Sequence, residues 1–145
     1  MDHSPILGPV VALAAWSLVV MLWMFATRFP AMRRKGLSLK GQVGSRGQQL
    51  DGLIDDRAQW VSHNYSHLME QPTIFYAVAL ALALMGQGDG INLILAWAYV
   101  GLRVLHSLVQ GTTNVVTVRF LMFAVSSLAL VGLTVHAAAA LLHAH

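Results

Sequence analysis

Residues 60–90 read WVSHNYSHLMEQPTIFYAVALALALMGQGDG, and this stretch decides the fold class. Between Arg57 and Asp89 the sequence has a single charged residue, Glu70. A helix that crosses a bilayer needs about 20 predominantly apolar residues, and residues 60–85 meet that requirement. The glycine-rich turn at 86–90 then returns the chain. We therefore predict a membrane helix that forms an antiparallel hairpin with the helix after it.

Three further stretches are almost free of charge. No charged residue lies between Asp2 and Arg28, only Arg103 lies between Asp89 and Arg119, and none follows Arg119. The first stretch is too long for a signal-peptide core and lacks a basic start, so we expect it to be retained. The predicted spans are residues 6–29, 60–85, 91–108 and 120–142. The sequence thus predicts an all-α, four-span integral membrane protein with one domain over residues 1–145.

The composition excludes several classes of protein. Of the 145 residues, 57% are hydrophobic and only 10% are charged, whereas soluble domains are about a quarter charged. The composition therefore argues against a soluble enzyme and excludes a disordered chain. The absence of cysteine rules out disulfides, thiolate metal sites and a cysteine nucleophile. The net charge of +3 does not indicate nucleic-acid binding, because the basic residues follow a membrane pattern.

That pattern concerns the side of the membrane on which the basic residues lie. With four spans, all nine lysines and arginines fall on one side, in or beside the first loop (about 30–59) and the third loop. By the positive-inside rule this side is cytoplasmic and both termini lie outside. We expect an inner (cell) membrane location in a bacterium. The basic loop can touch anionic lipid headgroups, although topology alone explains its charge.

Polar side chains inside the predicted spans are the main functional signal. They form one stripe in the second span and one in the third, each on a single helix face, and both lie in the cytoplasmic half of the bilayer. The stripes consist of His63, His67 and Glu70, with Asn64 beside them, and of Tyr99, Arg103, His106 and Gln110. Because an isolated intramembrane charge is costly, we expect Glu70 and Arg103 to be ion-paired or bridged by a polar ligand.

The stripes alone leave several interpretations open. They could form a binding pocket, or a buried polar clamp that holds the hairpin together. His63, His67, Glu70 and His106 could in principle ligate a metal, and His106 with His63 or His67 could ligate haem. No second Glu-x-x-His pair is present to hold two irons, and we predict no metal. His136 in the fourth span is expected to be a lone packed or lumen-facing histidine.

Two motifs resemble those of a known family. Residues 64–72 (NYSHLMEQP), running into TIFY at 73–76, resemble the second-helix signature of the MAPEG family, the membrane-associated proteins in eicosanoid and glutathione metabolism. Arg103-x-x-His106, followed by Asn114 and then Arg119, resembles the family's third-helix region. The length, the four spans and the long basic first loop agree, so the resemblance covers essentially the whole chain. It points to a bacterial-type member.

The resemblance implies a four-helix bundle that assembles as a homotrimer, with glutathione as cosubstrate bound near the cytoplasmic side. It implies catalytic roles for Arg103 and Arg119, and glutathione contacts from the residues at the other motif positions. Those cofactor-binding residues are Asn64, His67, Glu70 and His106. Arg28 or Arg57 could add a cationic contact.

Two functions are carried forward. The first is a glutathione-dependent transferase or peroxidase that acts on lipophilic small molecules from the bilayer. The second is a non-catalytic protein of the same fold, either a lipid-binding trimer or an accessory subunit of a larger complex. The second is favoured by departures from the family pattern, because His67, His63, Gln110 and Phe120 stand where members have Asn, Arg, Tyr and, in one branch, Ser.

Overall fold

The described part of the chain is helical throughout. A computed structural model describes residues 3–143, and that range contains no strand. The elements are α1 (Leu7–Arg34), the short 3₁₀ helix η1 (Gly47–Leu50), α2 (Asp56–Leu68), α3 (Pro72–Leu84), α4 (Gly90–Thr112) and α5 (Val116–His143). The predicted all-α class is confirmed.

Four segments are long and apolar enough to cross a membrane, namely α1, α2 together with α3, α4, and α5. They correspond to the four predicted spans, and the chain is an integral multi-pass membrane protein. Three helices are longer than the spans predicted from charge, because a helix can continue past the hydrocarbon into the polar interface. α1 runs to Arg34 rather than 29, α4 to Thr112 rather than 108, and α5 begins at Val116 rather than 120.

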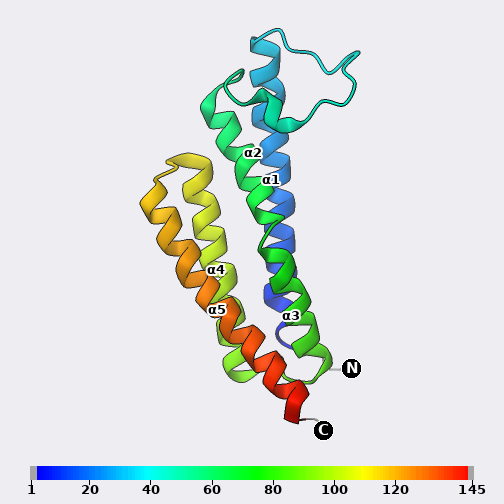
Figure 1. Ribbon diagram of the computed structural model, residues 1–145, viewed down its shortest axis with the longest axis vertical. Helices are drawn as coiled ribbons and strands as arrows, with labels where there is room; N and C mark the ends of the chain where they lie inside the picture. The colour runs from blue at the N-terminus through cyan, green and yellow to red at the C-terminus, as the bar shows by residue number, and fades with distance from the viewer. Residues whose placement is uncertain (1–2, 144–145) are drawn as a thin grey trace.

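The helices run up and down in an elongated bundle (Figure 1). α1 packs along α2 and α3, and α4 packs along α5 as a hairpin. α4 contacts α1 and α2, and α5 contacts α3. Both ends of the chain and the α3–α4 turn lie at one end of the bundle, and the long loop between α1 and α2 lies at the other (Figure 1). This is the arrangement that the charge pattern predicts.

The second span differs from the prediction, because it is not one continuous helix. α2 ends at Leu68 and α3 begins at Pro72. Proline has no N–H, so it cannot bond to the carbonyl four residues earlier and it suits the first turn of a new helix. Residues 69–71 therefore form a short break in the membrane span. The carbonyl of His67 loses its usual partner four residues on, and it accepts instead from the N–H of Glu70 (3.4 Å) and from a second donor on another helix.

The loop between α1 and α2 is partly ordered by contacts with both helices. α1 ends where Gly36 adopts a positive φ of 67°, and the N–H of Leu37 bonds to the carbonyl of Met32, which closes the helix. A small apolar cluster of Ala31, Met32, Ile54 and Ala58 holds the loop's return to α2. This cluster explains why α1 continues beyond the predicted span.

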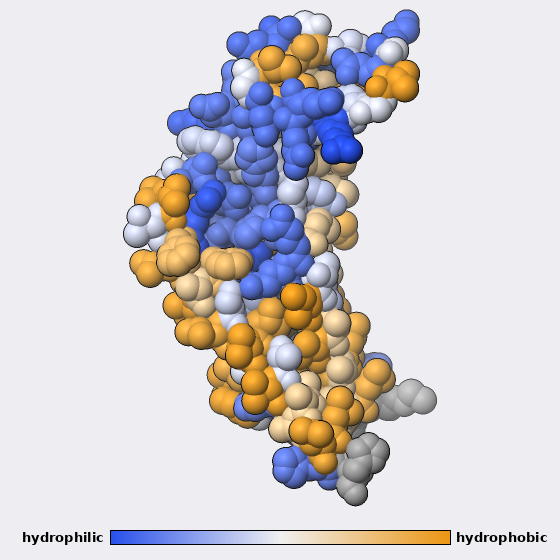
Figure 2. Space-filling model, viewed as in Figure 1, coloured by the Kyte–Doolittle hydropathy of each residue, from blue (hydrophilic) through white to orange (hydrophobic). Residues whose placement is uncertain are grey.

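The main core lies between the four spanning segments and extends from Ile6 to Ala137 in sequence. Many large apolar side chains instead face outward, such as Leu18, Leu84 and Leu128, which are exposed. Figure 2 shows hydrophobic residues over the half of the molecule that holds the termini, and hydrophilic residues toward the loop end. An apolar outer surface is what a lipid-embedded bundle requires.

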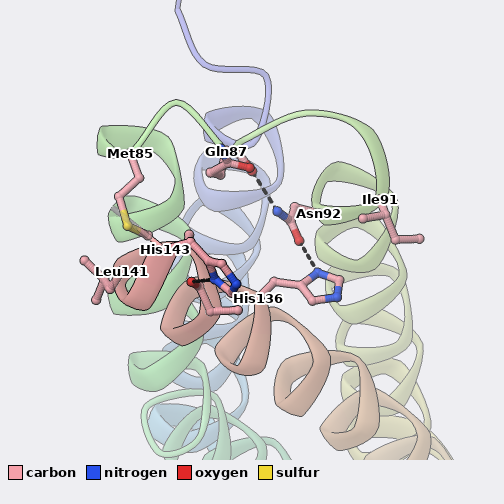
Figure 3. Close-up of a pocket in the computed structure, with 9 residues that line it drawn as sticks. Met85, Gln87, Ile91, Asn92, His136, Leu141 and His143 are labelled. Atoms are coloured by element: carbon pink, nitrogen blue, oxygen red, sulfur yellow. Dashed lines mark hydrogen bonds between the residues drawn. The ribbon is translucent and has the colours of Figure 1, made fainter. Parts of the chain in front are cut away.

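The end of the bundle that holds the termini carries a small polar contact. Asn92 donates from Nδ2 to the carbonyl of Gln87 (2.9 Å) and its Oδ1 lies 2.6 Å from Nδ1 of His136 (Figure 3). The expectation of a lone His136 is therefore wrong, because a buried asparagine on α4 supplies its partner. The pair ties α5 to the start of α4, beside a cavity of about 760 Å³.

Candidate functional site

The two predicted polar stripes lie against each other in the structure. All four stripe residues of α4 are buried: Tyr99, Arg103, His106 and Gln110. From α2, Asn64 is buried and donates from Nδ2 to the carbonyl of Ser107 (3.0 Å). Trp16 of α1 donates from Nε1 to the hydroxyl of the same serine (3.0 Å). Three spanning segments thus meet at one polar layer.

His67 is at the centre of this layer. Its ring lies 5.0 Å from the ring of His106 on α4 and 5.5 Å from that of Phe123 on α5, measured between centroids. Its Nδ1 lies 3.1 Å from a carboxylate oxygen of Glu70. His67 is the last stripe residue of α2, one residue before the helix ends, so both its ring and its carbonyl are placed by the helix break.

Arg103 is completely buried. It donates from Nη2 to the carbonyl of His67 (3.1 Å), Nη1 lies 3.4 Å from Nε2 of the same histidine, and the guanidinium stacks over Phe123 at 5.7 Å. From the end of α4 at Thr112, Arg103 is nine residues away, or about 14 Å along the helix. The charge therefore lies inside the membrane span.

A direct ion pair, the first of the two arrangements expected for Glu70 and Arg103, is not formed. Among residues 3–143, neither forms an ion pair with the other, and the His67 imidazole lies between them. The Glu70 side chain is 68% exposed, on the same helix face as the half-exposed His63, whereas the buried face of α2 runs through Asn64 and Leu68.

His63 also leaves the predicted stripe. Its Nε2 lies 3.1 Å from a carboxylate oxygen of Asp51 in the loop, and both side chains are about half exposed. The metal and haem alternatives that used His63 lose that ligand. Within residues 3–143, no group of three or more His, Asp or Glu side chains is close enough to hold a metal ion.

Arg119 lies one helix turn before Phe123 on α5. It is nearer than Phe123 to the end of the bundle that holds the α1–α2 loop. Its Nη1 donates to Oδ1 of Asn114, a residue with a positive φ of 53° in the turn between α4 and α5. Asparagine tolerates this conformation better than most residues. The two motif residues Asn114 and Arg119 are thus joined to each other.

Four buried polar atoms in this region have no hydrogen-bond partner within the described chain. They are Oδ1 of Asn64, Nε of Arg103, Oε1 of Gln110 and Nε of Arg119. Buried polar atoms are nearly always satisfied in native proteins. Each of these two guanidinium donors and two amide acceptors would be stabilised by a polar atom from outside this single chain.

Sequence reasoning missed four residues of the site. Ser107 and Trp16 connect α4 to α2 and α1, Phe123 covers Arg103 and His67, and Gln71 accepts from the Tyr99 hydroxyl (3.3 Å) while donating to Ser127 (2.8 Å). Ser107 and Phe123 carry no sequence signal. Gln71 does carry one, since a glutamine before Pro72 inside a predicted span needs a partner.

The fold and the polar layer define a class: a four-span helical membrane protein with a buried cationic cluster near the loop end. The sequence model of the MAPEG family matches residues 6–139, and the chain therefore belongs to the MAPEG family. No curated protein and no solved structure matched the chain in comparisons of sequence and structure.

Proposed function

We propose that this protein binds glutathione at the His67–Arg103 cluster and acts on lipophilic small molecules. It either transfers glutathione to them through the thiol or uses the thiol to reduce peroxides among them. One observation carries the proposal. Arg103 is completely buried but has no carboxylate partner in residues 3–143, and its Nε is unpartnered. A buried cation without an anion is strongly unfavourable, so an anionic group from a ligand would be stabilised there.

The residues of the cluster suit glutathione by charge and by hydrogen-bonding type. The tripeptide has two carboxylates, an ammonium group and a thiol. Arg103 and Arg119 offer guanidinium donors for anionic groups, and the Glu70 carboxylate, which is largely exposed, suits the ammonium. The free oxygens of Asn64 and Gln110 can accept from peptide N–H groups. When bound, glutathione supplies a thiolate nucleophile, which a neighbouring arginine favours.

Access to Arg103 passes through His67. The imidazole contacts Nη1 of Arg103 with one ring nitrogen and the Glu70 carboxylate with the other. The His67 side chain is 27% exposed. A ligand anion that takes the place of the imidazole on Nη1 would pair with Arg103. We expect His67 to compete with the ligand in this way. His67→Asn, which restores the residue type usual in the family, is then expected to strengthen glutathione binding.

A lipophilic second substrate has a neighbouring place to bind. An apolar groove of about 580 Å³ lies between α1 and α4, and Trp16 lines it with one face while its Nε1 donates to Ser107 of the polar layer. The groove is lined by Trp16, Val19, Trp97, Gly101 and Leu105 among others. Its surface is open to the bilayer side of the bundle, from which apolar molecules would enter.

A conjugation assay tests the proposal. Protein in proteoliposomes is mixed with glutathione and a chromogenic lipophilic electrophile, and the rate is compared with Arg103→Leu and Arg33→Leu. Arg33 is exposed in the last turn of α1, so its variant controls for loss of one charge. We expect activity in the wild type and the control, and none in Arg103→Leu. Equal activity of Arg103→Leu would refute the assignment.

The second candidate function is a non-catalytic one, either lipid binding or service as an accessory subunit of a larger membrane complex. It is favoured by the same His67 contacts, because the imidazole already serves both Arg103 and Glu70 and Arg103 has no exposed surface. In this case the wild type shows no glutathione-dependent turnover with any electrophile, and Arg103→Leu lowers stability without any effect on ligand affinity.

A further inference from the structure

A second cationic feature lies at the loop end of α1, away from the His67–Arg103 cluster. The loop curls over the end of the helix (Figure 1) and encloses a cavity of about 630 Å³. None of the residues that line it belongs to the polar layer described above. Its walls contain two arginines, Arg28 from α1 and Arg46 from the loop, and no acidic residue.

Neither arginine is neutralised within the described chain. Arg28 donates to the Ser62 hydroxyl (3.2 Å) and to the Gly47 carbonyl (3.0 Å), which are uncharged acceptors. Arg46 forms no ion pair in residues 3–143 and is exposed. By contrast, the nearby Arg34 pairs with Asp55 at 2.6 Å. The cavity therefore keeps two positive charges for an anion.

The lining also has an apolar part, which continues down the helix. Phe25 and Phe29 stack with centroids 5.7 Å apart and are 39% and 46% exposed. Leu53, which is 54% exposed, faces them from the loop. Exposed phenylalanine rings suit contact with acyl chains just below the headgroups.

The height of the cavity in the membrane matches that boundary. Arg28 is 21 residues beyond the start of α1 at Leu7, or about 32 Å along the helix at 1.5 Å per residue. The hydrocarbon core of a bilayer is about 30 Å thick. If α1 begins at one face of the hydrocarbon, Arg28 reaches the headgroups of the other face, with Phe25 one turn deeper.

We propose that this cavity is a binding site for one anionic phospholipid, with its phosphate between Arg28 and Arg46 and an acyl chain along Phe25 and Phe29. The charge selects an anionic headgroup, and the apolar wall selects a lipid over a free anion. A bound lipid would also fix the loop onto α1, because Arg28 already binds the carbonyl of Gly47 at the start of η1.

Native mass spectrometry in mild detergent tests this site with dioleoyl phosphatidylglycerol and dioleoyl phosphatidylcholine as probes. One basic residue near an anionic headgroup is worth about fivefold in affinity. We expect the first phosphatidylglycerol to bind at least about tenfold more tightly than phosphatidylcholine. Equal affinity for the two lipids would overturn the proposal.

Three variants separate the cavity from general surface charge. Arg46→Gln should weaken phosphatidylglycerol binding by about fivefold, whereas Arg57→Gln, which removes the same charge outside the cavity, should leave the first site unchanged. Gly47→Ala keeps the net charge, but a Cβ at this position would lie 2.8 Å from Nη2 of Arg28. It should therefore displace the guanidinium and weaken binding as well. Equal weakening by Arg46→Gln and Arg57→Gln would overturn the proposal.

Glycerol 3-phosphate distinguishes a lipid from a free phosphate. It carries the headgroup charge without the acyl chains, so we expect no displacement of phosphatidylglycerol at equal concentration. Displacement at equal concentration would show a soluble-anion site and refute the lipid assignment. Far-UV circular dichroism of each variant establishes that the helices are retained, and Phe29→Ala, which leaves all charges in place, should also reduce phosphatidylglycerol binding.

Discussion

Replacement of Gly111 by alanine should weaken the packing of α4 on α1. A Cβ added at Gly111 would lie 2.5 Å from Cη2 and 2.8 Å from Cζ3 of the Trp23 ring, far closer than carbon atoms approach in a packed core. Gly101 in the same helix has no atom within 4 Å of an added Cβ. Glycine to alanine in a helix otherwise gains up to about 1 kcal/mol, and this gain applies to both positions.

The expected difference between the two variants follows from overpacking. Forcing an extra methyl group into a filled space costs about 1–3 kcal/mol, because the Trp23 ring or the helix must move. Gly111→Ala should thus be about 1–3 kcal/mol less stable than Gly101→Ala. Unfolding in mixed micelles of mild detergent and dodecyl sulfate, followed by tryptophan fluorescence and circular dichroism, measures the free energy of unfolding.

A rescue variant makes the test specific. Trp23→Leu removes the ring that the new methyl group would meet, so the double variant Gly111→Ala, Trp23→Leu should be no less stable than Trp23→Leu alone. Gly111→Ala with the same unfolding free energy as Gly101→Ala would refute the close approach of α1 and α4 at this point. A loss that persists without Trp23 would assign the effect to another neighbour.

Three other predictions follow from the arrangement of the helices. With both termini outside, an impermeant maleimide added outside should label Asp89→Cys and not Val43→Cys, which is 98% exposed in the loop; the opposite labelling would reverse the topology. Trp16→Phe loses the bond to Ser107 (3.0 Å) and should cost about 0.6 kcal/mol, at most about 1.7, whereas Trp97→Phe, at a 47% exposed position, should cost less in the same unfolding assay. Native mass spectrometry should show three copies of the chain, as the family resemblance implies, and a clean monomer would exclude a site shared between subunits.

The fold was predictable because charge and hydropathy act over whole spans. Four long stretches with at most one charged residue each are enough to specify four helices, and the turn at 86–90 specifies the hairpin. The expectation of a continuous second span, without the break at 69–71, was the error with the largest effect on the predicted site. Pro72 signals the break. Whether a proline kinks a membrane helix or ends it depends on which donors bond to the carbonyls that lose their helical partners. Here Arg103, from a distant part of the sequence, bonds to the carbonyl of His67.

The candidate site was predictable in composition but not in connectivity. Helical spacing places Tyr99, Arg103, His106 and Gln110 on one face, and the structure buries that face. Spacing cannot show that His67 stands between Glu70 and Arg103, because that depends on the end of α2. Likewise, the contact between His63 and Asp51 depends on how the loop folds back, and no periodic pattern describes a loop of this length.

The central claim is that the His67–Arg103 cluster binds glutathione, and isothermal titration calorimetry in mild detergent tests it most directly. Truncating a buried charged partner typically costs 2–5 kcal/mol of binding, or about thirtyfold and more in affinity. We expect wild-type protein and Arg33→Leu to bind glutathione with equal affinity, and Arg103→Leu to bind it at least about thirtyfold more weakly. Equal binding by Arg103→Leu, or no binding by the wild type, would contradict glutathione binding at this cluster.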